Sequence, residues 1–65
     1  MTASRVYVGG QGEYSELHVL GDGRVLRCCP GERGGQIEIG RDLSAEDRRL
    51  LVARIITDEG LTLRE

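Results

Sequence analysis

The residues of this chain that could do chemistry lie on one predicted β-hairpin. Glu16 and His18 alternate on its first strand, and the adjacent Cys28 and Cys29 end its second strand. Glutamate, histidine and cysteine are all zinc ligands, and a cysteine near a histidine is also a starting point for nucleophilic catalysis. The residues do not have the C-x-x-C or H-x-x-x-H spacing of common zinc sites. A metal site would therefore need a further ligand, for example from a second subunit.

The turn between the two strands decides which of these side chains share a face. Asp22-Gly23 is a strong signal for a two-residue type I′ turn, and such a turn pairs Leu17 with Cys28. One face of the hairpin then carries four apolar residues: Leu17, Val19, Leu26 and Cys28. The outer face carries a mixed set: Glu16, His18, Leu20, Val25, Arg27 and Cys29. The sequence therefore predicts that Cys28 packs in the core and that Cys29 faces outward, roughly opposite Glu16.

A three-residue loop, Gly21-Asp22-Gly23, is the alternative. It pairs Leu17 with Arg27 and Val19 with Val25, which places Arg27 on the core side. A slip of one residue turns every side chain of a strand to the other face. We prefer the two-residue register because it keeps Arg27 outside the core.

The two cysteines are expected to be free thiols. Adjacent residues of a strand point to opposite faces, so a disulfide between Cys28 and Cys29 is not expected. An outward Cys29 beside Arg27 is a candidate reactive thiol or link between subunits, and Cys29, His18 and Glu16 are the candidate metal ligands. Catalysis would also need an oriented base and a pocket, for which one sheet and one helix offer little concavity. We expect no enzyme activity and no bound cofactor.

Hydrophobic periodicity predicts four strands and one helix. The strands are expected at 5–8, 15–20, 24–29 and 36–39, and the helix at about 45–59. Ser44 is the expected N-cap, with Asp47 three residues on, and Gly60 is expected to end the helix with positive φ. Residues 61–63 alternate again and suit a short final strand. The predicted fold class is α+β: an antiparallel β-meander of three to four strands, followed by one C-terminal amphipathic helix packed on one sheet face.

Composition indicates one small domain, residues 1–65, with an aliphatic core. The chain has two tyrosines and no phenylalanine or tryptophan. A chain of this length buries only about 60% of its extended surface, so a partner subunit is a reasonable expectation. The predicted core is Val6, Val8, Leu17, Val19, Leu26, Cys28, Ile37, Ile39, Leu51, Val52, Ile55 and Ile56.

The charge of the chain argues against nucleic-acid binding. The formal net charge is −2, and all nine basic residues are arginines, whereas nucleic-acid binding depends on clustered basic residues. A basic patch of Arg24, Arg27, Arg33 and Arg41 is conceivable, but acidic residues interleave with them. No apolar run suits a signal peptide or a membrane span. Two cysteines are too few for a secreted disulfide framework, so we expect a cytoplasmic, bacterial protein.

These observations favour a small non-enzymatic protein-binding module that acts as an inhibitor, adaptor or regulator. Open sheet edges invite strand addition, and a homodimer is expected. The candidate partner-binding residues are Leu50, on the outer face of the helix, together with Arg27 and Cys29. The alternatives are a thiol or metal module that uses Cys29 and His18, and a weak nucleic-acid-binding regulator.

The order of elements resembles the small emfourin-type inhibitors of bacterial metalloproteases. The shared features are Val8-Gly9-Gly10, Asp22-Gly23 and Leu43-Ser44-Ala45-Glu46. The resemblance covers most of the chain. Because the shared residues are turn and cap residues, it assigns no functional residue to this chain. It implies an inhibitor as one form of the binding module.

Overall fold

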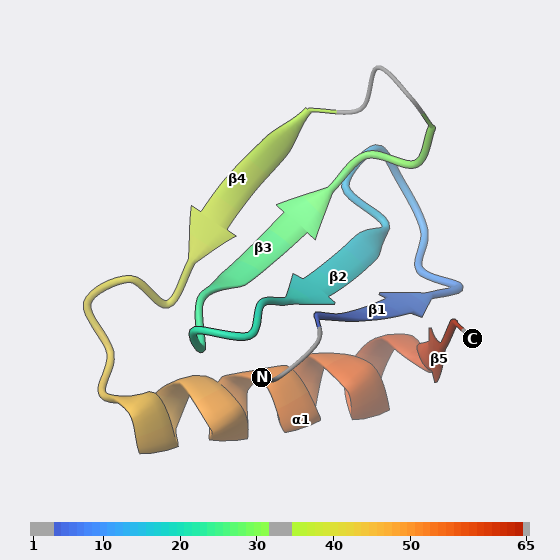
Figure 1. The fold of residues 1–65 in the computed structure, drawn as a ribbon. Helices are drawn as coiled ribbons and strands as arrows, with labels where there is room; N and C mark the ends of the chain where they lie inside the picture. Colours follow the sequence, from blue (N-terminus) through green and yellow to red (C-terminus); the bar gives the residue numbers. More distant parts are fainter. Residues whose placement is uncertain (1–3, 32–34, 65) are drawn as a thin grey trace.

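The structure is a computed structural model that describes residues 4–31 and 35–64. Its elements follow in the order β1 (Arg5–Val8), β2 (Glu16–Val19), β3 (Val25–Cys28), β4 (Gln36–Ile39), α1 (Ala45–Glu59) and β5 (Thr62–Leu63). The strands form one sheet in the order β4-β3-β2-β1-β5, and every pair is antiparallel. The helix crosses one face of this sheet, and β5 returns beside β1 (Figure 1). The predicted α+β meander with one helix and a short final strand is confirmed.

Local signals account for both ends of α1. The Ser44 hydroxyl accepts a hydrogen bond from the Asp47 backbone N–H at 3.1 Å, which satisfies one of the free N–H groups of the first turn. Gly60 has φ of 65°, and its N–H and that of Leu61 both donate to the Ile56 carbonyl. This left-handed cap is a common helix ending. It turns Leu61 back into the core, where only 6% of the residue is exposed.

The predicted register of the β2–β3 hairpin is wrong by one residue. Leu17 pairs with Arg27 and Val19 with Val25, as in the three-residue loop. Two 2.9 Å hydrogen bonds close this loop, from Leu20 N–H to the Arg24 carbonyl and from Gly23 N–H to the Leu20 carbonyl. A type I′ turn needs positive φ at both central residues, but among the described residues only glycines have positive φ. Gly23 supplies it, at 95°, and Asp22 does not.

The observed register turns the side chains of β3 to the opposite face from the one predicted, while those of β2 keep theirs. The core on the helix side is built from Leu17, Val25 and Leu61, with five partly buried residues packed against them: Tyr7, Ile39, Val52, Ile55 and Ile56. Val25 is 1% exposed, although it was predicted to face outward. Leu26 and Cys28 are buried as predicted, but the pairing places them on the face that α1 does not cover.

Strands β1 and β4 also differ from the predicted core. Because Tyr7 pairs with Leu17, Tyr7 faces the helix, and Val6 and Val8 lie on the opposite face. Ile37 was predicted to be buried but is 48% exposed, because its edge strand lies beyond the part of the sheet that α1 covers (Figure 1). The open sheet face and the β4 edge are therefore the surfaces to examine for function.

Candidate functional site

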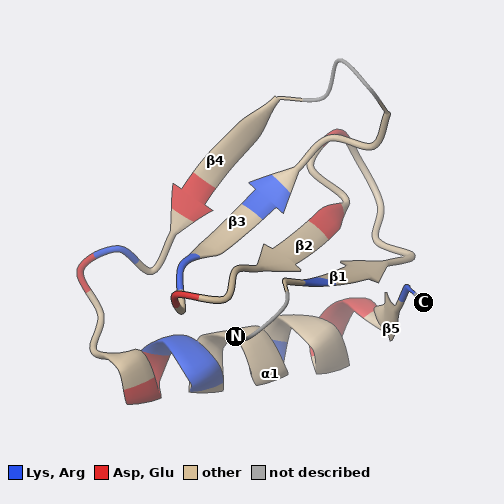
Figure 2. Cartoon of the chain, viewed as in Figure 1, with Lys and Arg blue, Asp and Glu red and all other residues tan. Residues whose placement is uncertain are grey.

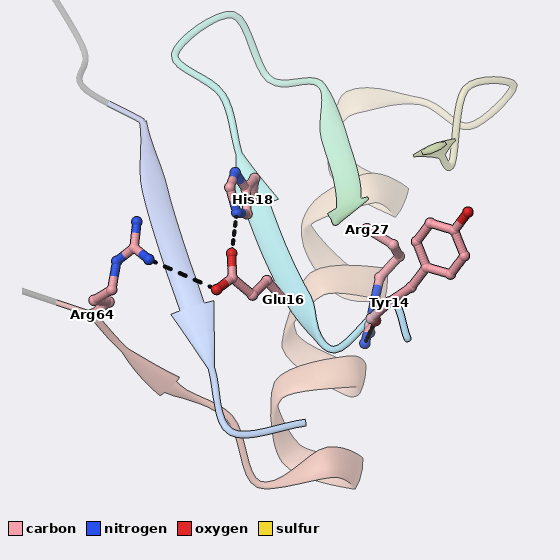
Figure 3. A network of polar contacts seen from close by, with 5 residues as sticks. All are labelled: Tyr14, Glu16, His18, Arg27 and Arg64. Atoms are coloured by element: carbon pink, nitrogen blue, oxygen red, sulfur yellow. Dashed lines mark hydrogen bonds and ion pairs between the residues drawn. The ribbon is translucent and has the colours of Figure 1, made fainter. Parts of the chain in front are cut away.

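A polar cluster lies on the open face of the sheet. The Glu16 Oε1 atom is 2.9 Å from His18 Nε2, and its Oε2 atom is 3.7 Å from a guanidinium nitrogen of Arg64. Because a carboxylate can only accept, Nε2 of His18 carries the proton of this hydrogen bond. Figure 3 shows Glu16 between the side chains of His18 and Arg64. The Glu16 side chain is 14% exposed, so it is shielded by neighbours that compensate its charge.

The cysteines occupy positions that the sequence did not predict. Cys28, not Cys29, pairs with Glu16. Burial raises the pKa of the Cys28 thiol, and the negative charge of Glu16 raises it further. Cys29 sits next to Gly35, beside Tyr14, and it lines one shallow hollow together with Glu16, His18 and Cys28. The predicted position of Cys29 opposite Glu16 is therefore wrong, because Cys28 occupies it.

The cluster does not assemble a metal site. In the part of the chain that the structure describes, no three His, Cys, Asp or Glu side chains are placed so as to hold a metal ion. Both cysteines are free, and a thiol whose pKa is raised is a poor nucleophile at neutral pH. The raised pKa of Cys28 therefore disfavours nucleophilic chemistry by that thiol at neutral pH.

Arg27 ties the sheet to the helix and to the preceding loop. Its guanidinium donates to both carboxylate oxygens of Glu59, at 2.8 and 2.9 Å, and twice to the Tyr14 carbonyl, at 2.6 and 3.0 Å. The side chain is only 12% exposed, and its hydrogen bond to Glu59 lowers the pKa of that carboxyl. Arg27 was predicted to be a partner-binding residue, but its polar groups are used within the chain.

Strand β4 is an edge strand of the sheet, and none of the described strands pairs with its outer side. The Cys29 N–H donates to the Gly35 carbonyl at 2.9 Å, so Gly35 directs its backbone groups towards β3. Hydrogen bonding alternates along an antiparallel strand, so Ile37 and Ile39 also bond to β3. Gln36 and Glu38 therefore direct their N–H and C=O groups outward. No described element runs along that side of β4 (Figure 1).

Exposed apolar side chains accompany this edge and the nearby end of the helix. Ile37 is 48% exposed on the helix side of β4, and Leu43 and Leu50 are 39% and 63% exposed. Leu43 and Leu50 line one shallow hollow with Asp47, Leu51 and Arg54. The predicted outward position of Leu50 is confirmed. A contact between Leu50 and a partner remains a prediction.

A larger hollow of about 420 Å³ lies between the sheet and α1, which lines it from Ala45 to Ile56. Tyr7, Val19, Val25 and Val52 form much of its lining, and three arginines, Arg5, Arg48 and Arg49, also border it. The described lining includes no carboxylate, histidine or cysteine.

Opposite charges alternate over the surface. Arg24 pairs with Asp22 at 2.8 Å, and Arg27 and Arg64 pair with Glu59 and Glu16. Figure 2 shows blue and red segments interspersed along the β2–β3 turn, the β4–α1 connection and α1. Of the arginines predicted as a basic patch, Arg33 lies outside the described residues. Within residues 4–31 and 35–64, no helix is long and apolar enough to span a lipid bilayer.

Comparison with known proteins found no matching family model, no matching curated protein and no matching solved structure. The functional inference therefore depends on the chain itself.

Sequence reasoning named strand edges in general but did not identify the β4 edge as a particular site. Its signal was present in Gln36-Ile37-Glu38-Ile39, whose two isoleucines alternate with polar residues. Both isoleucines were assigned to the core, because alternation tells which residues share a face but not how far the helix covers that face. The extent of cover is a tertiary property.

Proposed function

We propose that this protein is a small non-enzymatic protein-binding module that receives a strand of its partner along the outer edge of β4. The free edge of β4 carries the proposal. Gln36 and Glu38 offer outward backbone donors and acceptors there, and Ile37 offers a half-exposed apolar side chain. In recognition by strand addition, backbone hydrogen bonds supply affinity and alternate side chains supply specificity.

The other candidate surfaces of the molecule are less suited to binding a partner strand. The second edge strand, β5, has only two residues, so it can make few hydrogen bonds to a partner. Arg27 is engaged by Glu59 and Tyr14. The polar cluster of the open face is internally compensated. Natural sheets often protect their edges with proline or covering segments. Residues 36–39 contain no proline, and no described strand pairs with the outer side of β4.

In-cell photo-crosslinking tests the proposal. A benzophenone amino acid replaces Ile37 in the full chain, and crosslinked proteins are identified by mass spectrometry from the native cell. The matched variant adds Glu38→Pro, which removes one outward N–H but no hydrogen bond to β3, and proline is tolerated on the solvent side of an edge strand. We expect crosslinks from position 37 that disappear with Glu38→Pro.

The same crosslinker at exposed Leu50 tests the helix as an alternative interface. The absence of protein crosslinks at position 37 would contradict the proposal. Crosslinks that survive Glu38→Pro would contradict it as well, since they would not depend on strand pairing. Circular dichroism of both variants checks that the fold is intact.

A further inference from the structure

We infer that the occupant of the β4 edge is a second copy of this chain, paired antiparallel about a twofold axis at Ile37. This inference rests on the proposed function and names its partner. It starts from the alternating backbone hydrogen bonds of β4. The N–H and C=O groups of Gln36 and Glu38 point outward, whereas those of Ile37 bond to β3. An isologous contact must bring the same edge of each copy together.

Backbone geometry limits the registers that such a dimer can adopt. Residues that hydrogen-bond across the new edge must all have their backbone N–H and C=O groups pointing outward. Gln36 and Glu38 of one copy can therefore pair only with Gln36 or Glu38 of the other copy, or with residues displaced from these by two positions. When Gln36 of one copy faces Glu38 of the other, the two residues exchange backbone N–H to C=O hydrogen bonds. The twofold axis repeats this pair, so both outward residues of each chain are hydrogen-bonded. Ile37 then faces its own copy across a pair without backbone hydrogen bonds, where side chains approach most closely.

Charge and local structure oppose the neighbouring registers. A shift of two residues in one direction places Glu38 against Glu38, and like charges directly opposite are unfavourable. That register also requires Gly40, which has φ of 66° and whose carbonyl already accepts from Leu43 N–H at 3.1 Å. A shift in the other direction places Gln36 against Gln36 and so loses both pairs of an amide with a carboxylate. The Gln36–Glu38 register instead places the Gln36 amide of each copy beside the Glu38 carboxylate of the other copy, so that the amide can donate to the carboxylate at both pairs.

The paired edges would form one continuous sheet with both helices on the same side. The Ile37 pair on that side covers the apolar residue that α1 leaves 48% exposed. The interface is short, with two outward residues in each copy, and is smaller than the roughly 800 Å² per partner of stable complexes. We therefore expect a weak dimer that dissociates on dilution.

Charge variants at Gln36 test the register by analytical ultracentrifugation over a concentration series of the full chain. Gln36→Glu places two carboxylates opposite each other at both pairs and should weaken the dimer by about five- to tenfold, whereas Gln36→Lys should tighten it by a similar factor. Added salt should reduce both effects. Gln11→Glu and Gln11→Lys are the matched controls, because Gln11 is exposed in a loop outside the interface.

Two results would overturn the inference: a protein that stays monomeric up to about 1 mM, or a dimer that responds to the Gln36 and Gln11 variants equally. Crosslinks from position 37 to other proteins, with a monomeric purified chain, would overturn this inference and leave the proposed function standing. A monomeric chain with no crosslinks from position 37 would overturn both.

Discussion

Replacement of Arg27 by alanine distinguishes the observed hairpin register from the predicted one. In the observed register Arg27 is 12% exposed and joins β3 to Glu59 and to the Tyr14 carbonyl. In the two-residue register it would point into solvent on the other face. Arg27→Ala therefore removes either a sheet-to-helix tie or an ordinary surface side chain.

The expected loss of stability follows from these contacts. The Tyr14 carbonyl would lose a charged donor, which is worth about 1.5–3 kcal/mol. The Glu59 carboxylate is 36% exposed, so its ion pair is screened and adds up to about 1 kcal/mol. We expect Arg27→Ala to lower the free energy of unfolding by about 2–4 kcal/mol, a large part of the roughly 3–10 kcal/mol of a domain this size.

Urea denaturation followed by circular dichroism measures this loss, since the chain has no tryptophan. Arg24→Ala is the matched control, because Arg24 directly precedes the same strand and its ion pair with Asp22 leaves more than half of each side chain exposed. The stability lost in this variant should stay within about 0.5 kcal/mol. If Arg27→Ala costs no more than Arg24→Ala, Arg27 does not tie the sheet to the helix, and the three-residue loop is the wrong register.

Four further outcomes are expected. The Arg27 hydrogen bond keeps the pKa of Glu59 below its ordinary value of 4.5. The pair therefore stabilises the fold above that pH, and this stabilisation is lost as pH falls through the lowered folded-state pKa. The free energy of unfolding, measured as a function of pH in the acid range, should show this loss, and Glu59→Gln should abolish it. Val25→Ala should cost about 2–3 kcal/mol in urea denaturation, since the side chain is 1% exposed, and a surface-like loss would contradict its place in the core. Ser44→Ala should lower helix stability by about 1 kcal/mol through loss of the N-cap, visible as a lower thermal midpoint. Alkylation mapped by mass spectrometry at neutral pH should modify Cys29 before Cys28, because burial shields Cys28 and raises its pKa; faster reaction of Cys28 would contradict its position beside Glu16.

Elements that depend on neighbouring residues could be predicted from the sequence. Ser44, Asp47 and Gly60 mark the ends of α1 because cap hydrogen bonds join residues within one helical turn. The strand at Gln36–Ile39 follows from its alternation and its flanking glycines. Local chemistry suffices for such features, and all of them are confirmed.

The register required information from outside the hairpin. Asp22-Gly23 is compatible with both loops, because Gly23 takes positive φ in either case. The deciding group was Glu59, which lies 32 residues from Arg27 and makes an arginine acceptable on the helix side. An unpaired arginine would be costly there. The hairpin sequence does not show that Glu59 lies close enough to pair with Arg27, so it favours an outward Arg27. The positions of Cys28 and Cys29 followed from the same choice and were wrong for the same reason.

The proposed dimer also bears on the hazard of open sheet edges. A sheet that adds strands at both edges would extend into a fibre, because a head-to-tail contact that does not close continues indefinitely. Pairing through β4 is isologous and uses this edge of both copies at once. The described edges that remain are then the two β5 strands, each of two residues, with Arg64 following directly. A short edge beside a positive charge resists further strand pairing, so assembly through β4 should end at two copies. The length of β5 would thus set the size of the assembly, while Gln36 and Glu38 set its register.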